Sequence, residues 1–217
     1  MTTGNDNNFS SSLLDEIQGR SCHPIFCEHE NCPACMHTAH GVFIRAMGRW
    51  EALLEEAIVR EMCGSAREGC QEPYGRFQIA DQEGALRKLR ETAYEQETDT
   101  VLEGASAKGY ILLHDPHLVR AVADYWVVNS RVADVMARNQ SKIENLTNIR
   151  HAAAHDSART KQLLQLAIKY FAPDASENAN AEVGVFLLSR RANGELMLAY
   201  LLDELSELAA SCAPPDE

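Results

Sequence analysis

The segment Arg150-His151-Ala152-Ala153-Ala154-His155 places an arginine and a histidine five positions apart, with a second histidine directly after the arginine. A guanidinium binds phosphate oxygens through two parallel hydrogen bonds, and an imidazole exchanges protons near neutral pH. Together the two groups suit metal-independent chemistry on a phosphodiester. We refer to these six residues as the hexad.

Two other interpretations of the hexad remain open. In the first, Arg150 and His155 are ordinary surface residues at the end of a helix. In the second, His151 and His155 form a metal-binding pair one helical turn apart. The three residues between these histidines are alanines, so the pair lacks the glutamate that serves as general base in zinc hydrolases with this spacing.

Two helices are expected to position the hexad. Apolar residues at three- and four-residue steps predict a helix from Ser141 to the hexad, and a cap at Asp156 or Ser157 predicts the start of the next one. A helix that ends beside His155 would let the long Arg150 side chain reach a phosphate bound there. The apolar stripe leaves Asn148, His151 and His155 off the core face, so we expect them to line the edge of a groove.

The rest of the chain also has helical spacing. We expect one helix at residues 38–62, a more polar one at 79–97, and one from Pro116, capped by Asp115, to about Asn139. The Asn193-Gly194 turn signal allows a C-terminal β-hairpin, but the leucines between Leu196 and Leu208 favour a helix. The predicted fold class is therefore all-α, an antiparallel helical bundle, with a helical hairpin as an option at its C-terminal end.

Composition limits the classes of function. A formal net charge of -12 over 217 residues argues against a general nucleic-acid coat, which needs a broad basic face, but permits a local phosphate site. No apolar run approaches the ~20 residues that span a bilayer, so we expect no membrane association. Residues 1–12 lack the basic and apolar regions of a secretory signal. The prediction is a cytoplasmic protein with reduced thiols.

Two segments resemble the HEPN domains, the all-α family of many prokaryotic toxins and defence ribonucleases. Residues 148–155, Asn-Ile-Arg-His-Ala-Ala-Ala-His, resemble the family signature of Arg, a polar residue, three further residues and His. Residues 43–55 resemble the first helix of subfamilies related to the RiboL-PSP group, in which an Arg-Trp-Glu triplet, here Arg49-Trp50-Glu51, precedes an apolar run. The resemblance covers roughly residues 38–172.

The resemblance implies a HEPN-like helical domain at residues 38–172 and a function for it. Outside that range, composition and spacing predict a polar arm with a Cys/His-rich segment at residues 1–37 and a helical extension packed on the same domain at residues 173–217. The implied function is metal-independent endoribonuclease activity, as a toxin or defence effector. Attack by the ribose 2′-hydroxyl would leave 2′,3′-cyclic phosphate ends, with no cofactor for catalysis.

Each hexad residue then has an expected role. His155 would be the general acid or base, Arg150 the phosphate clamp, and His151 and Asn148 would orient the phosphate or His155. HEPN enzymes imply a homodimer that brings two hexads into one cleft, and an antitoxin or regulatory protein is a further expected partner besides the RNA substrate. The sequence has Ser157 where HEPN toxins paired with nucleotidyltransferases often carry a tyrosine, so regulation through that tyrosine is not expected.

A Cys/His-rich segment precedes the first long helix. Cys22, Cys27, Cys32 and Cys35 are candidate ligands of a structural zinc ion, and Cys32-x2-Cys35 has the spacing of a zinc half-site. In an alternative set, His40 replaces Cys22. Reduced thiols in a flexible arm and redox-active cysteines are the other interpretations.

Two functions of other classes stay open beside the ribonuclease. One is a non-catalytic HEPN-like module that binds a nucleotide or a protein. The other is a helical adaptor that acts through a zinc-binding arm and the C-terminal leucines.

Overall fold

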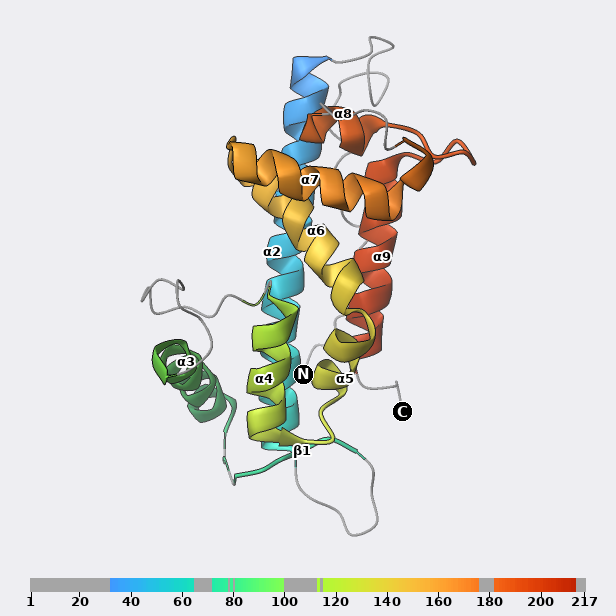
Figure 1. The fold of residues 1–217 in the computed structure, drawn as a ribbon. Helices are drawn as coiled ribbons and strands as arrows, with labels where there is room; N and C mark the ends of the chain where they lie inside the picture. The colour runs from blue at the N-terminus through green and yellow to red at the C-terminus, as the bar shows by residue number, and fades with distance from the viewer. Residues whose placement is uncertain are drawn as a thin grey trace. The chain divides into compact units, whose positions relative to one another are not determined.

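The computed structural model describes residues 32–64, 72–77, 79, 81–99, 113, 115–175 and 182–213. These residues are mostly helical, which confirms the all-α prediction (Figure 1). In chain order the elements are α2 (Pro33–Cys63), β1 (Tyr74–Gly75), α3 (Gln82–Asp99), α4 (Pro116–Trp126), β2 (Val127–Val128), α5 (Arg131–Arg138), α6 (Gln140–Ala154), α7 (Ala158–Phe171), the 3-10 helix η2 (Pro173–Ala175), α8 (Val183–Leu188) and α9 (Met197–Cys212).

The described residues fall into two compact units, and the expected domain organisation stays a prediction. One unit contains the described residues up to Arg49 together with Asn145–Leu208, and the other contains Trp50–Glu144 and the described residues after Leu208. Helices α2, α6 and α9 each contribute to both units. The hexad and the whole of α7 belong to the first unit. Among the described residues, no helix has the length and apolar character that crossing a bilayer requires.

The apolar stripes predicted from the sequence form the core. Of the stripe on α2, only Ala57 remains partly exposed. The C-terminal leucines lie on α9 and are at most 3% exposed. Burial of each such side chain contributes roughly 1.5–3 kcal/mol to folding. The buried members of these two stripes are Phe43, Met47, Trp50, Leu54, Ile58, Leu201, Leu202, Leu205 and Leu208.

Helix α2 begins earlier than predicted, at Pro33 instead of about Thr38. The Met36 N–H donates to the Cys32 carbonyl at 3.0 Å, which closes the first helical turn, and proline suits the first position of a helix. Cys35 lies on the buried side of this turn. The end of the Cys/His-rich segment is therefore helix rather than loop, and the rest of the expected arm lies outside the described residues.

The single helix predicted from Pro116 to Asn139 is wrong, because the chain reverses in its middle. Asp115 caps α4 as expected, with its carboxylate accepting from the N–H groups of His117 and Leu118. Helix α4 then ends at Trp126, and Val127–Val128 pairs antiparallel with Tyr74–Gly75. Asn129 takes a positive φ of 57°, and Ser130 caps α5, which packs against α4.

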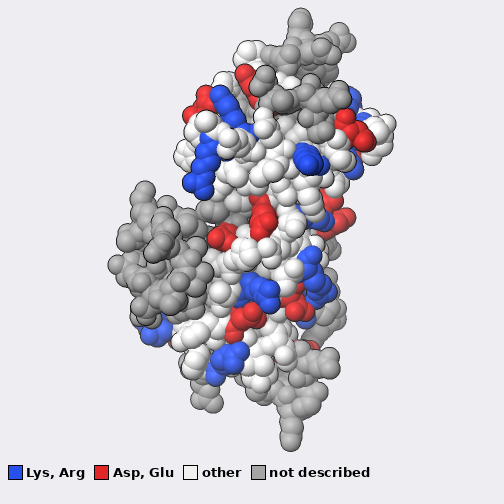
Figure 2. Space-filling view, in the orientation of Figure 1, with Lys and Arg blue, Asp and Glu red and all other residues white. Residues whose placement is uncertain are grey.

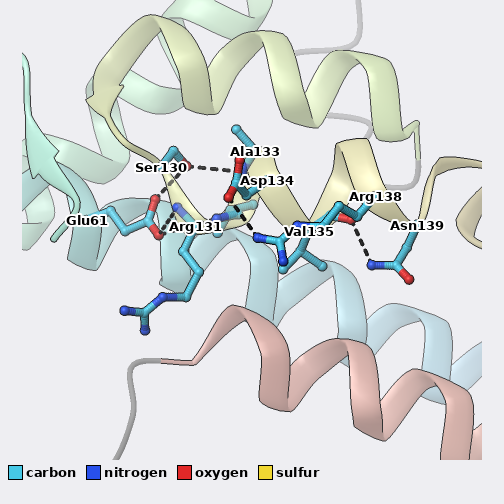
Figure 3. A network of polar contacts seen from close by, with 9 residues as sticks. Glu61, Ser130, Arg131, Ala133, Asp134, Val135, Arg138 and Asn139 are labelled. Atoms are coloured by element: carbon cyan, nitrogen blue, oxygen red, sulfur yellow. Dashed lines mark hydrogen bonds and ion pairs between the residues drawn. The ribbon is translucent and has the colours of Figure 1, made fainter. Parts of the chain in front are cut away.

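A carboxylate from α2 holds the start of α5 in place (Figure 3). Glu61 accepts hydrogen bonds from Ser130 Oγ at 2.6 Å, from the Arg131 N–H at 3.0 Å and from the Val132 N–H at 3.3 Å. Burial raises the pKa of the Glu61 carboxyl, and these three hydrogen bonds oppose that shift. Glu61 thus satisfies backbone donors that the first turn of a helix leaves unpaired.

The C-terminal segment is helical, as the leucine pattern favoured. Helices α8 and α9 are joined by a turn in which Gly194 adopts a φ of 85° and Arg190 forms an isolated antiparallel bridge with Leu196. Gly184 of α8 lies against α2, where an added Cβ would come within 2.4 Å of the Met36 Cβ. Close packing of α8 on α2 therefore requires glycine at this position.

Candidate functional site

A short, tightly bonded turn connects the two helices that carry the candidate site (Figure 1). Helix α6 ends at Ala154, and Ser157 is the N-cap of α7, which confirms the cap predicted at Asp156 or Ser157. Ser157 and Thr160 form a capping box, in which each side chain bonds the other residue's backbone N–H. The Thr160 hydroxyl also donates to the His155 carbonyl at 2.8 Å. The backbone beside His155 is fixed by these contacts.

The core face of α6 determines which hexad side chains reach the surface. Ile143, Leu146 and Ile149 are at most 1% exposed and anchor the helix. Asn148, Arg150 and His151 are partly buried, whereas His155 is exposed just beyond the last helical residue. None of Asn148, His151 and His155 is fully buried, which agrees with their expected placement off the core face, and the groove that they would line stays a prediction.

Electrostatics link His151 to three neighbouring groups. Burial lowers the pKa of His151, and the charges of Arg150, His155 and Arg159 lower it further. Since an imidazole has an ordinary pKa of about 6.5, this lowering favours the neutral form of His151 at pH 7. The structure therefore brings the predicted residues Arg150, His151 and His155 into one electrostatic cluster. The influence of Asn148 on the cluster stays a prediction.

Arg159 is the cluster member that the sequence motif does not contain. It lies in the first turn of α7, on the far side of the turn from Arg150, and it is exposed. The sequence contains a signal for Arg159, because it lies two residues after the predicted Ser157 cap. A cap so soon after His155 starts a new helix next to the end of the preceding one, and this brings the first residues of the new helix near the hexad. We call Arg150, His151, His155 and Arg159 the hexad cluster.

The first turn of α7 has an unusual charge distribution. The positive end of the helix dipole favours acidic residues in a first turn, but this turn contains none and instead carries Arg159 and Lys161. Lys161 forms an exposed ion pair with Asp156 at 2.9 Å, which has little energetic weight. Because Asp156 offsets the charge of Lys161, Arg159 and the helix dipole are the main sources of positive potential next to His155.

The zinc prediction is tested only in part by the described residues. Cys32 and Cys35 lie at the start of α2, whereas Cys22 and Cys27 lie outside the described residues. His40 lies further along α2, and its Nε2 is buried without a hydrogen-bond partner in the described part of the chain. Within that part, no group of three or more His, Cys, Asp or Glu side chains is placed to hold a metal ion. A structural zinc stays a prediction.

The distribution of basic side chains bears on the size of any phosphate site. On the face seen in Figure 2, the Lys and Arg side chains of the described residues lie in small groups among Asp and Glu side chains. This distribution agrees with the expectation that any phosphate site on so acidic a chain is local.

Comparison with known proteins gave no match to a family model, to a curated protein or to a solved structure.

Proposed function

We propose that this protein is a metal-independent endoribonuclease of the HEPN type, with a toxin or defence role. The main support is the hexad cluster, in which a partly buried His151 with a lowered pKa and an exposed His155 lie among the charges of Arg150 and Arg159. Proton carriers and phosphate-binding cations are the groups that RNA transesterification needs.

The reaction assigns a task to each member of the cluster. The 2′-hydroxyl of the ribose attacks the adjacent phosphorus, the bond to the 5′-oxygen breaks, and a proton moves from the nucleophile to the leaving group. One histidine takes the first proton and another supplies the second. Arg150 and Arg159 stabilise the charge on the phosphorane oxygens, because a guanidinium stays protonated and fits two of them at once.

The N-terminus of α7 supports the same site. Its helix dipole and Arg159 favour a bound anion at the turn that holds His155. A phosphate placed there lies at the end of α6, within the reach of a long arginine side chain. The site does not require a strongly basic protein, which agrees with the net charge of -12.

We expect the protein to cleave RNA in EDTA and to leave 2′,3′-cyclic phosphate ends. The reason is that the cluster itself supplies the proton carriers and the cations that the reaction needs. The measurement incubates purified protein with a mixed RNA pool, with and without EDTA, and determines the ends of the products.

A circular dichroism spectrum in EDTA is the control, because chelation of a structural zinc would unfold the chain rather than stop the chemistry. If the folded protein loses activity in EDTA and regains it with Mg²⁺ or Mn²⁺, the proposed mechanism is wrong. Retained RNA binding without cleavage would instead support the non-catalytic binding module.

We further expect a homodimer in which the 141–155 segments face each other across the two-fold axis. Two-fold pairing would place two copies of His155 around one phosphate and provide an acid and a base on opposite sides. Light scattering should give twice the chain mass of 24.1 kDa.

Mixing two inactive variants tests whether the cleft is shared. His155→Ala and Arg150→Ala chains that are each inactive are mixed and allowed to exchange subunits. Activity returns in the mixed dimer if one intact copy of each residue is enough, and it stays low if both copies of His155 are needed. A fully active monomer would contradict the shared cleft and leave His151 as the second proton carrier.

A further inference from the structure

The exposed side of α7 carries a narrow stripe that starts at the hexad cluster. At 100° per residue, its members fall within about a third of the helix circumference. The stripe runs from Arg159 in the first turn to Tyr170 in the last, over about 17 Å at 1.5 Å per residue. All of its members are exposed. We call Arg159, Gln162, Leu166, Lys169 and Tyr170 the α7 stripe.

The charge of α7 differs from that of the whole chain. The helix contains no acidic residue and has three basic ones, Arg159, Lys161 and Lys169, although the chain as a whole has a net charge of -12. The nearby acid is outside the helix, where Asp156 pairs with Lys161. The stripe itself therefore presents two cations to a ligand, one at each end.

Large apolar side chains are exposed along the same stripe. Leu166 is 57% exposed and Tyr170 is 46% exposed. These two apolar side chains lie one helical turn apart and are flanked by cations. They therefore form no continuous apolar ridge of the kind that fits a groove on another protein. A cation next to an exposed aromatic ring, here Lys169 beside Tyr170, is typical of surfaces that bind a nucleic-acid strand, with a phosphate on the cation and a base on the ring.

The ring of Tyr170 is supported from behind by packed aromatic residues. Tyr170 contacts buried Phe171 edge to face, with centroids 4.8 Å apart, and Phe171 contacts Tyr200 of α9 at 6.2 Å. The Arg191 guanidinium lies 3.6 Å above the Tyr200 ring. A ring held in this way loses little conformational entropy when a base stacks on its exposed side.

We propose that the α7 stripe binds single-stranded RNA and guides it into the hexad cluster, with Lys169 on a backbone phosphate and Tyr170 stacked on a base. This proposal rests on the ribonuclease function and adds the substrate class, an unpaired strand, and two positioning residues. Base-paired RNA does not fit, because its bases are stacked on one another and cannot lie on Tyr170.

Binding can be measured without cleavage. The probe is a fluorescent 2′-O-methyl oligonucleotide of about 12 nucleotides, within the ~4–16 typical of single-strand sites, whose blocked 2′-oxygen cannot attack. Fluorescence anisotropy gives its Kd. Tyr170→Ala should raise the Kd about 5–150-fold, which corresponds to the loss of one stacked base. Tyr170→Phe keeps the ring and should bind like the wild type.

Lys169→Gln should weaken binding and reduce the slope of log Kd against log salt concentration by about 0.7, the value for one phosphate contact on a single strand. With cleavable RNA, both Tyr170→Ala and Lys169→Gln should raise KM and leave kcat nearly unchanged, because they act on positioning rather than on proton transfer.

The second unit supplies matched controls. Tyr125 is 47% exposed and also contacts its neighbour Trp126 edge to face, at 5.2 Å. Arg138 is an exposed cation paired with Asp134 at 2.7 Å. Tyr125→Ala and Arg138→Gln should leave the Kd unchanged.

The outcomes separate this inference from the ribonuclease proposal. Stripe-dependent binding without any cleavage of RNA would support the α7 stripe and overturn the ribonuclease. Normal binding and cleavage by Tyr170→Ala would overturn the stripe and leave the ribonuclease intact. Equal affinity for a duplex probe and a single-stranded probe would also overturn the α7 stripe as a single-strand site. The same holds if the protein binds anionic lipid vesicles and Tyr170→Ala abolishes that binding.

Discussion

Replacing His155 with alanine is expected to lower RNA cleavage about 10²–10⁴-fold, the usual loss for a general acid or base. The side chain is exposed beyond the end of α6, so its removal leaves the core stripe of that helix intact and should barely change the melting temperature. The fixed backbone at this position, where Thr160 donates to the His155 carbonyl at 2.8 Å, does not depend on the imidazole. The measurement is kcat/KM on a defined single-stranded RNA, together with thermal unfolding.

Arg150→Lys is the companion variant. A lysine keeps the charge but cannot reproduce the two parallel hydrogen bonds of a guanidinium, so we expect strongly reduced cleavage.

His117→Ala is the matched control for His155→Ala. His117 is a 67% exposed histidine on α4 whose Nε2 lies 3.2 Å from Glu144 Oε1. If His155→Ala and Arg150→Lys both cleave like the wild type, the hexad is ordinary helix surface and the ribonuclease proposal fails.

Glu61→Ala is expected to give the largest loss of stability among single polar substitutions, about 1–3 kcal/mol of unfolding free energy. The carboxylate accepts from Ser130 Oγ and from the backbone N–H of Arg131 (Figure 3). It also accepts from the backbone N–H of Val132. Alanine would leave these donors at the start of α5 without their acceptor. Urea denaturation followed by circular dichroism measures the effect.

Glu56→Ala provides the control on the same helix. Glu56 is 62% exposed and pairs with Arg60 one turn later, a type of contact that contributes about 0.3–0.5 kcal/mol. Equal losses for Glu61→Ala and Glu56→Ala would show that Glu61 does not anchor α5.

The sequence was sufficient where short-range contacts determine structure. The all-α class, the caps at Asp115 and Ser157, and the buried stripes on α2 and α9 were all predicted correctly, because hydrogen bonding and side-chain spacing within a few turns determine them. The Ser157 cap was the most useful of these predictions, since it placed His155 at the end of α6.

Tertiary structure decided the features that join distant parts of the chain. The break between α4 and α5 depends on Val127–Val128 pairing with Tyr74–Gly75, a contact between segments about fifty residues apart that no local pattern encodes. In the same way, the carboxylate of Glu61 caps a helix that begins seventy residues later. The apolar spacing on both sides of residues 127–129 continued as if one helix ran through, so the reversal was missed.

The candidate site shows the same division. The sequence by itself supplied Arg150, His151 and His155 and the helix end that places them. Burial and the charge of Arg159 on α7 lower the pKa of His151, and the end of α6 leaves His155 exposed. A residue type and its spacing determine which chemical groups are present. The pKa of each group depends on desolvation and on charges from other helices, and these exist only once the chain has folded.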